Sequence, residues 1–185
     1  MEHKGSILIE TPRLILRRFE RKDVLNVFDN ITSDDRITQF MTWPTHKNIE
    51  TTEKLVNGWL RQYEDMSFYR WAIVPKEIGE PIGVITVVNM DERAENVEIG
   101  YYIGSKWWNR GFTTQAVRSI IHFLFNEVRV GRIEACPNVI NKQSCRVLEK
   151  CGFVFEGILR KALWDNNGIC DKAMYSIISD EYPPS

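Results

Sequence analysis

Arg110 and Gly111 stand immediately before a segment whose apolar residues recur at helical spacing, from about residue 111 to 128. The first N–H groups of a helix lack intrahelical acceptors, and the helix dipole places partial positive charge there. A glycine lets the backbone approach a bound phosphate closely, and an arginine adds a cation. The two residues therefore favour an anion site, although the same pair also occurs in ordinary turns.

Glu98 lies in a segment, residues 97–103, in which apolar side chains alternate with others. In a strand, one face would carry Glu98, Gly100 and Tyr102, and the opposite face the more apolar Val97, Ile99, Tyr101 and Ile103. If the apolar face packs on a helix, Glu98 faces an open site. A carboxylate there can remove a proton from a reacting group such as an amine, directly or through one water. Glu98 is thus a candidate general base, with a surface ion pair as the alternative.

Ser144 lies three residues after Asn141, which opens a predicted helix over residues 141–151. Asparagine is a favoured N-cap, and its side chain would accept the Ser144 N–H. Ser144 shares an inward stripe with the apolar residues at positions 147, 148 and 151, so its hydroxyl needs a hydrogen-bond partner. That partner is either a helix carbonyl or a bound ligand.

The cysteines, Cys136, Cys145, Cys151 and Cys170, form no Cys-x-x-Cys pair, and the chain has 3 histidines. We therefore expect no metal site, and free thiols in a reducing cytoplasm. Cys136 precedes a proline on a predicted strand, and Cys145 has no histidine nearby. Covalent catalysis through a cysteine is therefore disfavoured.

The chain has 185 residues, of which 43% are hydrophobic and 26% charged, as in an ordinary globular protein. Its 24 basic and 25 acidic residues give a formal net charge of -1, which disfavours nucleic acid and anionic membranes as partners. No apolar stretch approaches the roughly 18 residues of a membrane span, and the N-terminus lacks the apolar run of a signal peptide. We expect a single cytoplasmic domain over residues 1–185, with its core at about 8–180.

The elements around the candidate residues must bring them together. Periodicity and turn residues predict strand 8–19, helices 23–31 and 51–63, strands 68–74, 82–90 and 97–103, helix 111–128, strand 132–136, helix 141–151, and strands 153–164 and 169–178. Residues 97–136 form a strand–helix–strand unit, so its two strands should be parallel. The sequence Asp165-Asn166-Asn167-Gly168 predicts a C-terminal β-hairpin, whose edge could serve a homodimer. The prediction is an α+β fold with a mixed, mostly antiparallel central sheet and helices on both faces.

Residues 98–116 and 141–153 resemble the two signature regions of the GNAT acyltransferase superfamily. The most specific part is the Asn-x-x-Ser…Leu-Glu-Lys-x-Gly-Phe motif of residues 141–153. The resemblance is closest to the RimJ/RimL-like branch, the ribosomal-protein N-terminal acetyltransferases, and weaker matches extend it over about residues 10–180. It implies a GNAT fold and an N-acetyltransferase that uses acetyl-CoA as co-substrate.

The family's phosphate-loop pattern, Gln/Arg-x-x-Gly-x-Gly/Ala, falls on residues 108–113. Trp108, Asn109 and Thr113 depart from it, which a loop that binds through backbone N–H groups tolerates where its backbone angles allow. The resemblance also implies that the strand ending at Ile103 splays from its parallel neighbour, so that its backbone can pair with the pantetheine amides. The implied cofactor contacts are Tyr102, Ile103, Trp108, Asn109, Arg110, Gly111, Phe112, Thr113, Thr114, Asn141 and Ser144.

The same resemblance puts Asn141 and Ser144 beside the thiol end of the cofactor. Many family members carry a tyrosine general acid where this chain has Leu148, so that role falls to Ser144 or to water. The implied reaction is direct attack by a primary amine in a ternary complex, with Glu98 as the base.

Trp43 and Tyr102 are the aromatic residues that we expect in the acceptor site. The branch resemblance suggests a protein N-terminal α-amine as acceptor, and a polyamine, an aminoglycoside or another small amine is the alternative. A non-catalytic acyl-CoA-binding sensor is a further alternative, because Leu148 cannot donate a proton.

Overall fold

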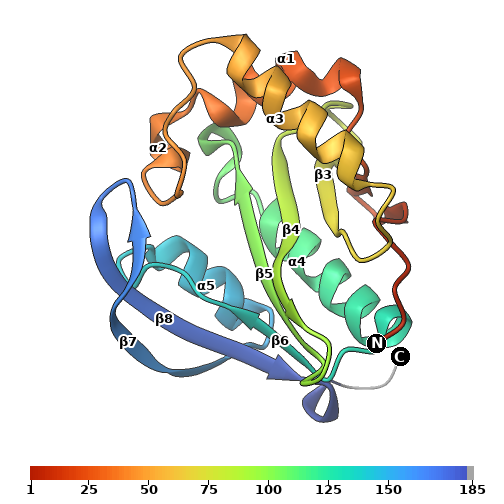
Figure 1. Cartoon of the computed structure of the whole chain (residues 1–185), viewed down its shortest axis with the longest axis vertical. Helices are drawn as coiled ribbons and strands as arrows, with labels where there is room; N and C mark the ends of the chain where they lie inside the picture. The colour runs from red at the N-terminus through yellow and green to blue at the C-terminus, as the bar shows by residue number, and fades with distance from the viewer. Residues whose placement is uncertain (183–185) are drawn as a thin grey trace.

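Figure 1 shows the computed structural model, which describes residues 1–182. Its centre is an eight-stranded sheet in the order β1-β2-β3-β4-β5-β6-β8-β7. The strands are β1 (Ile9–Glu10), β2 (Leu14–Arg17), β3 (Arg70–Pro75), β4 (Gly83–Asp91), β5 (Asn96–Ile103), β6 (Arg132–Ala135), β7 (Val154–Asp165) and β8 (Gly168–Ile178). Neighbouring strands are antiparallel except β5 and β6, which are parallel. The predicted mixed, mostly antiparallel sheet and the C-terminal hairpin are confirmed.

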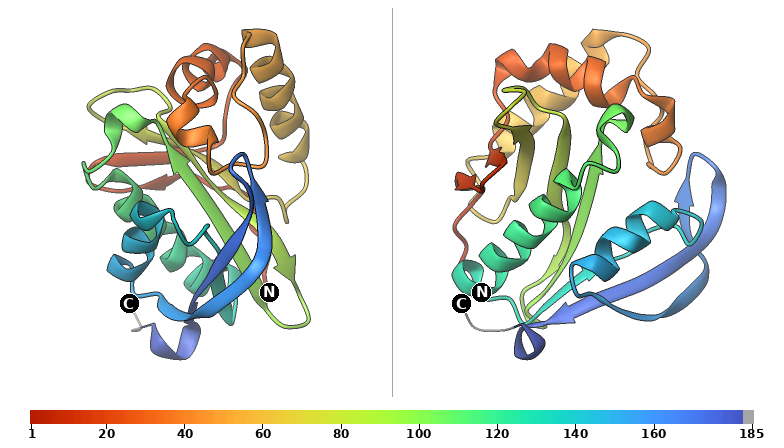
Figure 2. Two further views of the ribbon diagram at one scale, coloured as in Figure 1. Left: turned by 90° about the vertical axis from the view of Figure 1, so that its left-hand side faces the viewer. Right: turned by 180° about the vertical axis from the view of Figure 1, so that it is seen from behind.

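Helices cover both faces of this sheet (Figures 1 and 2). They are α1 (Val24–Val27), α2 (Asp35–Thr38), α3 (Ile49–Gln62), α4 (Phe112–Phe123) and α5 (Lys142–Lys150). Trp59 of α3 packs with Val84 of the sheet in one hydrophobic cluster, whereas Ile120 of α4 and Leu148 of α5 belong to a second cluster with Trp71. The sheet therefore separates an α1/α3 face from an α4/α5 face.

Three predicted elements differ in detail from the structure. The helix expected over residues 23–31 is α1 followed by a π-helical turn (Phe28–Thr32). The strand expected over residues 8–19 is two short strands, because the chain turns at Thr11, whose N–H donates to the Leu14 carbonyl (2.9 Å). Pro12 follows and has no N–H to continue a ladder. The helix expected over residues 111–128 is α4 followed by a π-helical turn (Leu124–Val128). β1, the first of the two short strands, is the outermost strand of the sheet.

The parallel strands β5 and β6 part soon after they begin. They pair over Asn96↔Arg132, Val97↔Ile133 and Glu98↔Glu134, and beyond Glu98 they diverge into a V (Figure 1). The predicted splay is therefore present, and its apex lies at Glu98. From there to Ile103, the side of β5 that faces β6 has no strand partner among residues 1–182.

The tip of the β7–β8 hairpin reaches the loop that follows α2 (Figure 1). The Asn166 side-chain amide donates to the carbonyls of Thr38 and Trp43, both at 2.8 Å, and the Asn167 amide donates to the carbonyl of Gln39 (2.7 Å). These bonds join segments more than 120 residues apart in sequence. They fix the loop that carries Trp43 above the open side of the V.

Among residues 1–182, none of the helices has both the length and the apolar character that a bilayer crossing requires.

Candidate active site

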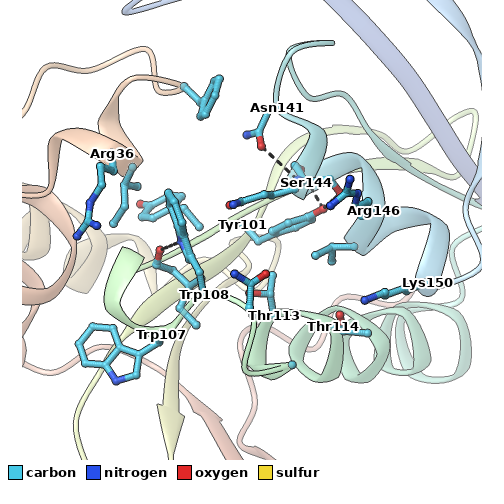
Figure 3. A pocket seen from close by; sticks show the side chains of 18 of the residues that line it. Arg36, Tyr101, Trp107, Trp108, Thr113, Thr114, Asn141, Ser144, Arg146 and Lys150 are labelled. Atoms are coloured by element: carbon cyan, nitrogen blue, oxygen red, sulfur yellow. Dashed lines mark hydrogen bonds between the residues drawn. The ribbon is translucent and has the colours of Figure 1, made fainter.

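A cleft of about 330 Å³ lies where β5 and β6 part, between β5, the loop before α4 and the start of α5 (Figure 3). It brings together nine of the predicted cofactor residues, namely Tyr102, Ile103, Trp108, Asn109, Gly111, Thr113, Thr114, Asn141 and Ser144. The side chains of the other two point elsewhere. Arg110 is exposed and pairs with Glu77 (2.9 Å), and Phe112 is buried beneath the guanidinium of Arg13. Arg110 and Phe112 can therefore serve a ligand here through their backbone N–H groups.

The loop before α4 is a cradle of unpaired backbone donors. The first hydrogen bond of the helix runs from the Gln115 N–H to the Gly111 carbonyl (3.1 Å). Within the part of the chain that the structure describes, the N–H groups of residues 109–114 have no acceptor. Such a run at the N-terminus of a twelve-residue helix suits a pyrophosphate, because it combines free donors with the positive end of the helix dipole. The residues present therefore fit the phosphates of coenzyme A.

Backbone angles explain why this loop tolerates its departure from the family pattern at Asn109. Asn109 has φ 61° and Gly111 has φ 81°, both in the left-handed region. Asparagine enters that region more easily than any bulky or β-branched residue. Asn109 thus preserves the conformation that a glycine would supply.

Trp108 has a role that the resemblance did not suggest. Its indole Nε1–H donates to the carbonyl of Ile103 (2.9 Å), at the end of β5 (Figure 3). The only polar group of the side chain is therefore used within the protein, and Trp108 can offer a ligand apolar contact alone.

The open side of β5 presents the backbone groups of Tyr101 and Ile103. The Gly104 N–H donates to the Ile82 carbonyl (2.8 Å), and in an antiparallel ladder every second residue bonds the same neighbour. Tyr102 therefore bonds towards β4, while Tyr101 points its N–H and carbonyl groups, and Ile103 its N–H group, into the cleft; the Ile103 carbonyl accepts from Trp108. Tyr101 was missed from sequence because alternation alone assigned it to the apolar face.

Ser144 is held from two directions. The Asn141 side chain accepts its N–H (3.1 Å), which confirms the predicted N-cap, and the Tyr101 hydroxyl lies 3.1 Å from both its carbonyl oxygen and its Oγ (Figure 3). Burial raises the pKa of Tyr101 well above its usual value, so the phenol stays protonated. Leu148 is fully buried in the core. The hydroxyl groups that face the cleft from this side thus belong to Ser144 and Tyr101.

Glu98 lies at the apex of the V and does not line the cleft. It shares one face of β5 with Tyr102, as predicted, and its carboxylate lies 3.8 Å from the Lys172 Nζ, with about a fifth of the side chain exposed (21%). The ring of Trp43 lies 6.0 Å from that of Tyr102 and 5.4 Å from that of His46. Glu98 and the two aromatic acceptor candidates thus occupy one face, and the cofactor residues mostly the other.

The thiols close to the site are poor nucleophiles. Burial raises the pKa of Cys136, beside Glu98, to about 12, and that of Cys151 to about 11. Because the thiolate is the reactive form, both cysteines are inert at neutral pH.

A sheet that opens between two parallel strands, beside a helix N-terminus with free N–H groups, defines a coenzyme A-dependent acyltransferase. The particular family follows from comparison. A family model described as an acetyltransferase (GNAT) domain matches residues 13–154, more than half of the chain, so the chain belongs to the GNAT acetyltransferases. It is an N-acetyltransferase that uses acetyl-CoA.

Three relatives illustrate the similarity. YoaA of Bacillus subtilis (strain 168), an uncharacterized N-acetyltransferase, is 29% identical over 171 residues, which cover 92% of this chain and 96% of YoaA. The putative ribosomal N-acetyltransferase YdaF of the same strain is 28% identical over 172 residues, or 91% of this chain and 93% of YdaF. The solved structure of RimL, a ribosomal L7/L12 alpha-N-protein acetyltransferase in complex with coenzyme A, has a TM-score of 0.84 at 20% identity and covers 95% of this chain and 100% of its own.

Proposed function

We propose that this enzyme acetylates the α-amine of a protein N-terminus by direct attack of the amine on acetyl-CoA in a ternary complex. The observation that carries the proposal is the division of the V into two sides. One side offers backbone donors for coenzyme A, and the other carries Glu98 at the apex and Tyr102, with the ring of Trp43 against it, further along the same strand. The names of YdaF and RimL support an N-terminal α-amine as the acceptor.

The cofactor side would bind acetyl-CoA mainly through the main chain. The N–H groups of residues 109–114 would hold the pyrophosphate, and the free N–H and carbonyl groups of Tyr101 and the free N–H of Ile103 would pair with the pantetheine amides as a neighbouring strand does. Acetyl-CoA, when bound, supplies an activated acetyl group as a thioester. All other chemistry falls to the residues of this chain.

Two proton transfers accompany the acyl transfer. An amine attacks only when neutral, so a proton must leave it, and Glu98 can accept that proton directly or through one water. The C–N bond forms as the C–S bond breaks, and the departing thiolate needs a proton, which Ser144 can supply from the opposite wall. Tyr101 orients the Ser144 hydroxyl and is therefore a positioning residue. Holding both reactants at the apex accounts for a further large part of the rate.

Ser144→Ala should lower kcat by at least about tenfold without changing the Kd for acetyl-CoA, because a positioned acid contributes about 10²–10⁴-fold and water can replace part of it. Tyr101→Phe should lower kcat less. If Tyr101 acts through Ser144, the double variant should be no slower than Ser144→Ala. Steady-state kinetics and calorimetric titration of acetyl-CoA measure these effects, and additive losses in the double variant would contradict the assigned roles.

Asn166→Ala should raise the KM for the acceptor by roughly tenfold, because it removes two hydrogen bonds, each contributing about 0.5–1.5 kcal/mol, that hold the Trp43 loop. The Kd for acetyl-CoA should change less, because most of the cleft lining lies outside this loop. Asn126→Ala is the matched control, since that side chain also donates to a backbone carbonyl (3.0 Å) but lies on the π-helical turn after α4. An unchanged acceptor KM in Asn166→Ala would show that the hairpin tip does not organise the acceptor site.

The function itself is tested by thiol release from acetyl-CoA against peptides with N-terminal Ser, Ala or Met, polyamines and aminoglycosides. We expect turnover with peptides alone. A response to polyamines or aminoglycosides alone would replace the proposed acceptor by a small amine. Tight acetyl-CoA binding without turnover on any amine would indicate an acyl-CoA sensor.

A further inference from the structure

Arg70 is a largely buried cation without an acidic partner. Its guanidinium lies over the ring of Trp59 (4.8 Å to the centroid) and of Phe68 (5.2 Å), and its Nε is buried without a hydrogen bond. Across residues 1–182, no carboxylate forms an ion pair with Arg70. Burial accordingly lowers the pKa of Arg70, although arginine remains charged.

The other part-buried arginines of the sheet are paired. Arg17 donates to both carboxylate oxygens of Asp23 (2.7 and 2.9 Å), and Arg132 does the same to Glu156 (3.0 and 2.6 Å). A buried charge is costly unless an opposite charge or several hydrogen bonds compensate it. Arg70 instead packs against two aromatic rings. Such packing leaves its N–H groups available to an anion from outside the chain.

Arg70 lies on the acceptor face of the sheet. It is in register with Thr86 of β4, which is in register with Gly100 of β5, and registered residues share a face. Gly100 stands between Glu98 and Tyr102 in the alternation of β5. Burial raises the pKa of Tyr102, and the positive charge of Arg70 opposes that rise. The two groups therefore lie close together.

The register sets the spacing between this cation and the site of attack. Adjacent strands lie about 4.8 Å apart, and Arg70 and Gly100 are two strands apart, so their Cα atoms are separated by about 10 Å. An extended peptide advances about 3.3 Å per residue. An amine near Glu98 and Tyr102 would thus have its second or third residue within reach of the guanidinium.

We propose that Arg70 binds an anionic group of the acceptor, namely the carboxylate of an acidic side chain two or three residues into the N-terminal segment that the enzyme acetylates. This inference rests on the proposed function and narrows it to acidic N-termini. A phosphate or carboxylate on a small amine presents the same chemistry, so the test includes one.

The test compares two peptides that start with Ser-Ala and differ only in Asp or Asn at position three, and likewise phosphoethanolamine and ethanolamine. For the wild type we expect kcat/KM to favour the Asp peptide by about tenfold or more, as a charged hydrogen bond gives. Arg70→Gln should bring the ratio of the two peptides near one while leaving the Asn peptide's rate within a few-fold, and Arg70→Lys should retain part of the preference. Arg18→Gln is the matched control, because Arg18 also lies over a ring (Tyr63, 5.2 Å) but is exposed and donates from Nε to the Ser6 carbonyl.

The outcomes separate this inference from the function beneath it. Equal rates with both peptides in the wild type, or a preference that survives Arg70→Gln, would overturn the role of Arg70 and leave peptide acetylation standing. Turnover of phosphoethanolamine alone, lost in Arg70→Gln, would support the anion site and overturn the peptide acceptor. If Arg70→Gln has a melting temperature well below that of the wild type, the test uses the wild type alone. The ratio of kcat/KM for the Asp and Asn peptides is then measured at increasing salt concentrations. A preference that comes from an ionic contact must decline as salt rises.

Discussion

Glu98→Gln should lower kcat by about 100-fold or more while leaving the Kd for acetyl-CoA unchanged, because a positioned base contributes about 10²–10⁴-fold. Glutamine keeps the size of the side chain and removes its ability to accept a proton. Glu98 lies at the apex, away from the residues that line the cofactor cleft. An unchanged Kd for acetyl-CoA therefore shows that the variant has lost a base and has kept its fold.

The pH profile of this variant is the sharper measurement. The α-amine of a peptide has a pKa of about 7.7–8.0, so solvent deprotonates it as the pH rises through that range. The deficit of Glu98→Gln should accordingly shrink towards pH 9. Glu134→Gln is the matched control, since Glu134 is the register partner of Glu98 and removes the same charge from the neighbouring strand. Equal losses in the two variants, or a deficit that is the same at every pH, would remove Glu98 from the role of base.

Gly111→Val should weaken acetyl-CoA binding by about 5- to 150-fold, which corresponds to about 1–3 kcal/mol of backbone strain. Gly111 has φ 81°, where a β-branched residue is strained, and it begins the helix whose first N–H groups form the anion cradle. If the backbone shifts to relieve that strain, the free N–H groups of the cradle move with it. Calorimetric titration of acetyl-CoA measures the loss directly.

Gly79 provides the control for this substitution. Its φ is 79°, nearly that of Gly111, and it lies in the turn between β3 and β4 with open space around the position of a Cβ. Gly79→Val thus imposes a similar local strain away from the cleft. A similar loss of acetyl-CoA affinity in both variants would mean that general destabilisation, not the cradle, is responsible.

Local patterns were enough to predict the order of the longer elements, the parallel pair and the positions of the loop and N-cap, but not the short helix α2 or the division of β1 from β2. Asn141 caps α5 as predicted because a cap depends on neighbours three residues apart. The loop at residues 109–114 is likewise predictable, because its position depends only on where α4 begins. These features are short-range, so sequence periodicity reveals them.

The remaining features depend on contacts between distant segments. Tyr101 meets Ser144 across the cleft because α5 packs against the sheet there, and alternation along β5 carries no information about α5. Arg70 is unusual only because none of the carboxylates of residues 1–182 pairs with it. The side chain of Arg110, the most conspicuous residue of the loop, turns away to Glu77, so the apparent cation of the motif matters less than its main chain.

The parting of β5 and β6 also links the stability of the enzyme to its substrate. The unpaired side of β5 leaves peptide groups that must bond water. A ligand that carries amides along a thin chain can replace that water. Binding to the folded chain alone raises the free energy of unfolding by RT ln(1 + [L]/Kd), so the thermal midpoint should rise with the acetyl-CoA concentration. The sheet of this protein is in that sense complete only when the substrate is present.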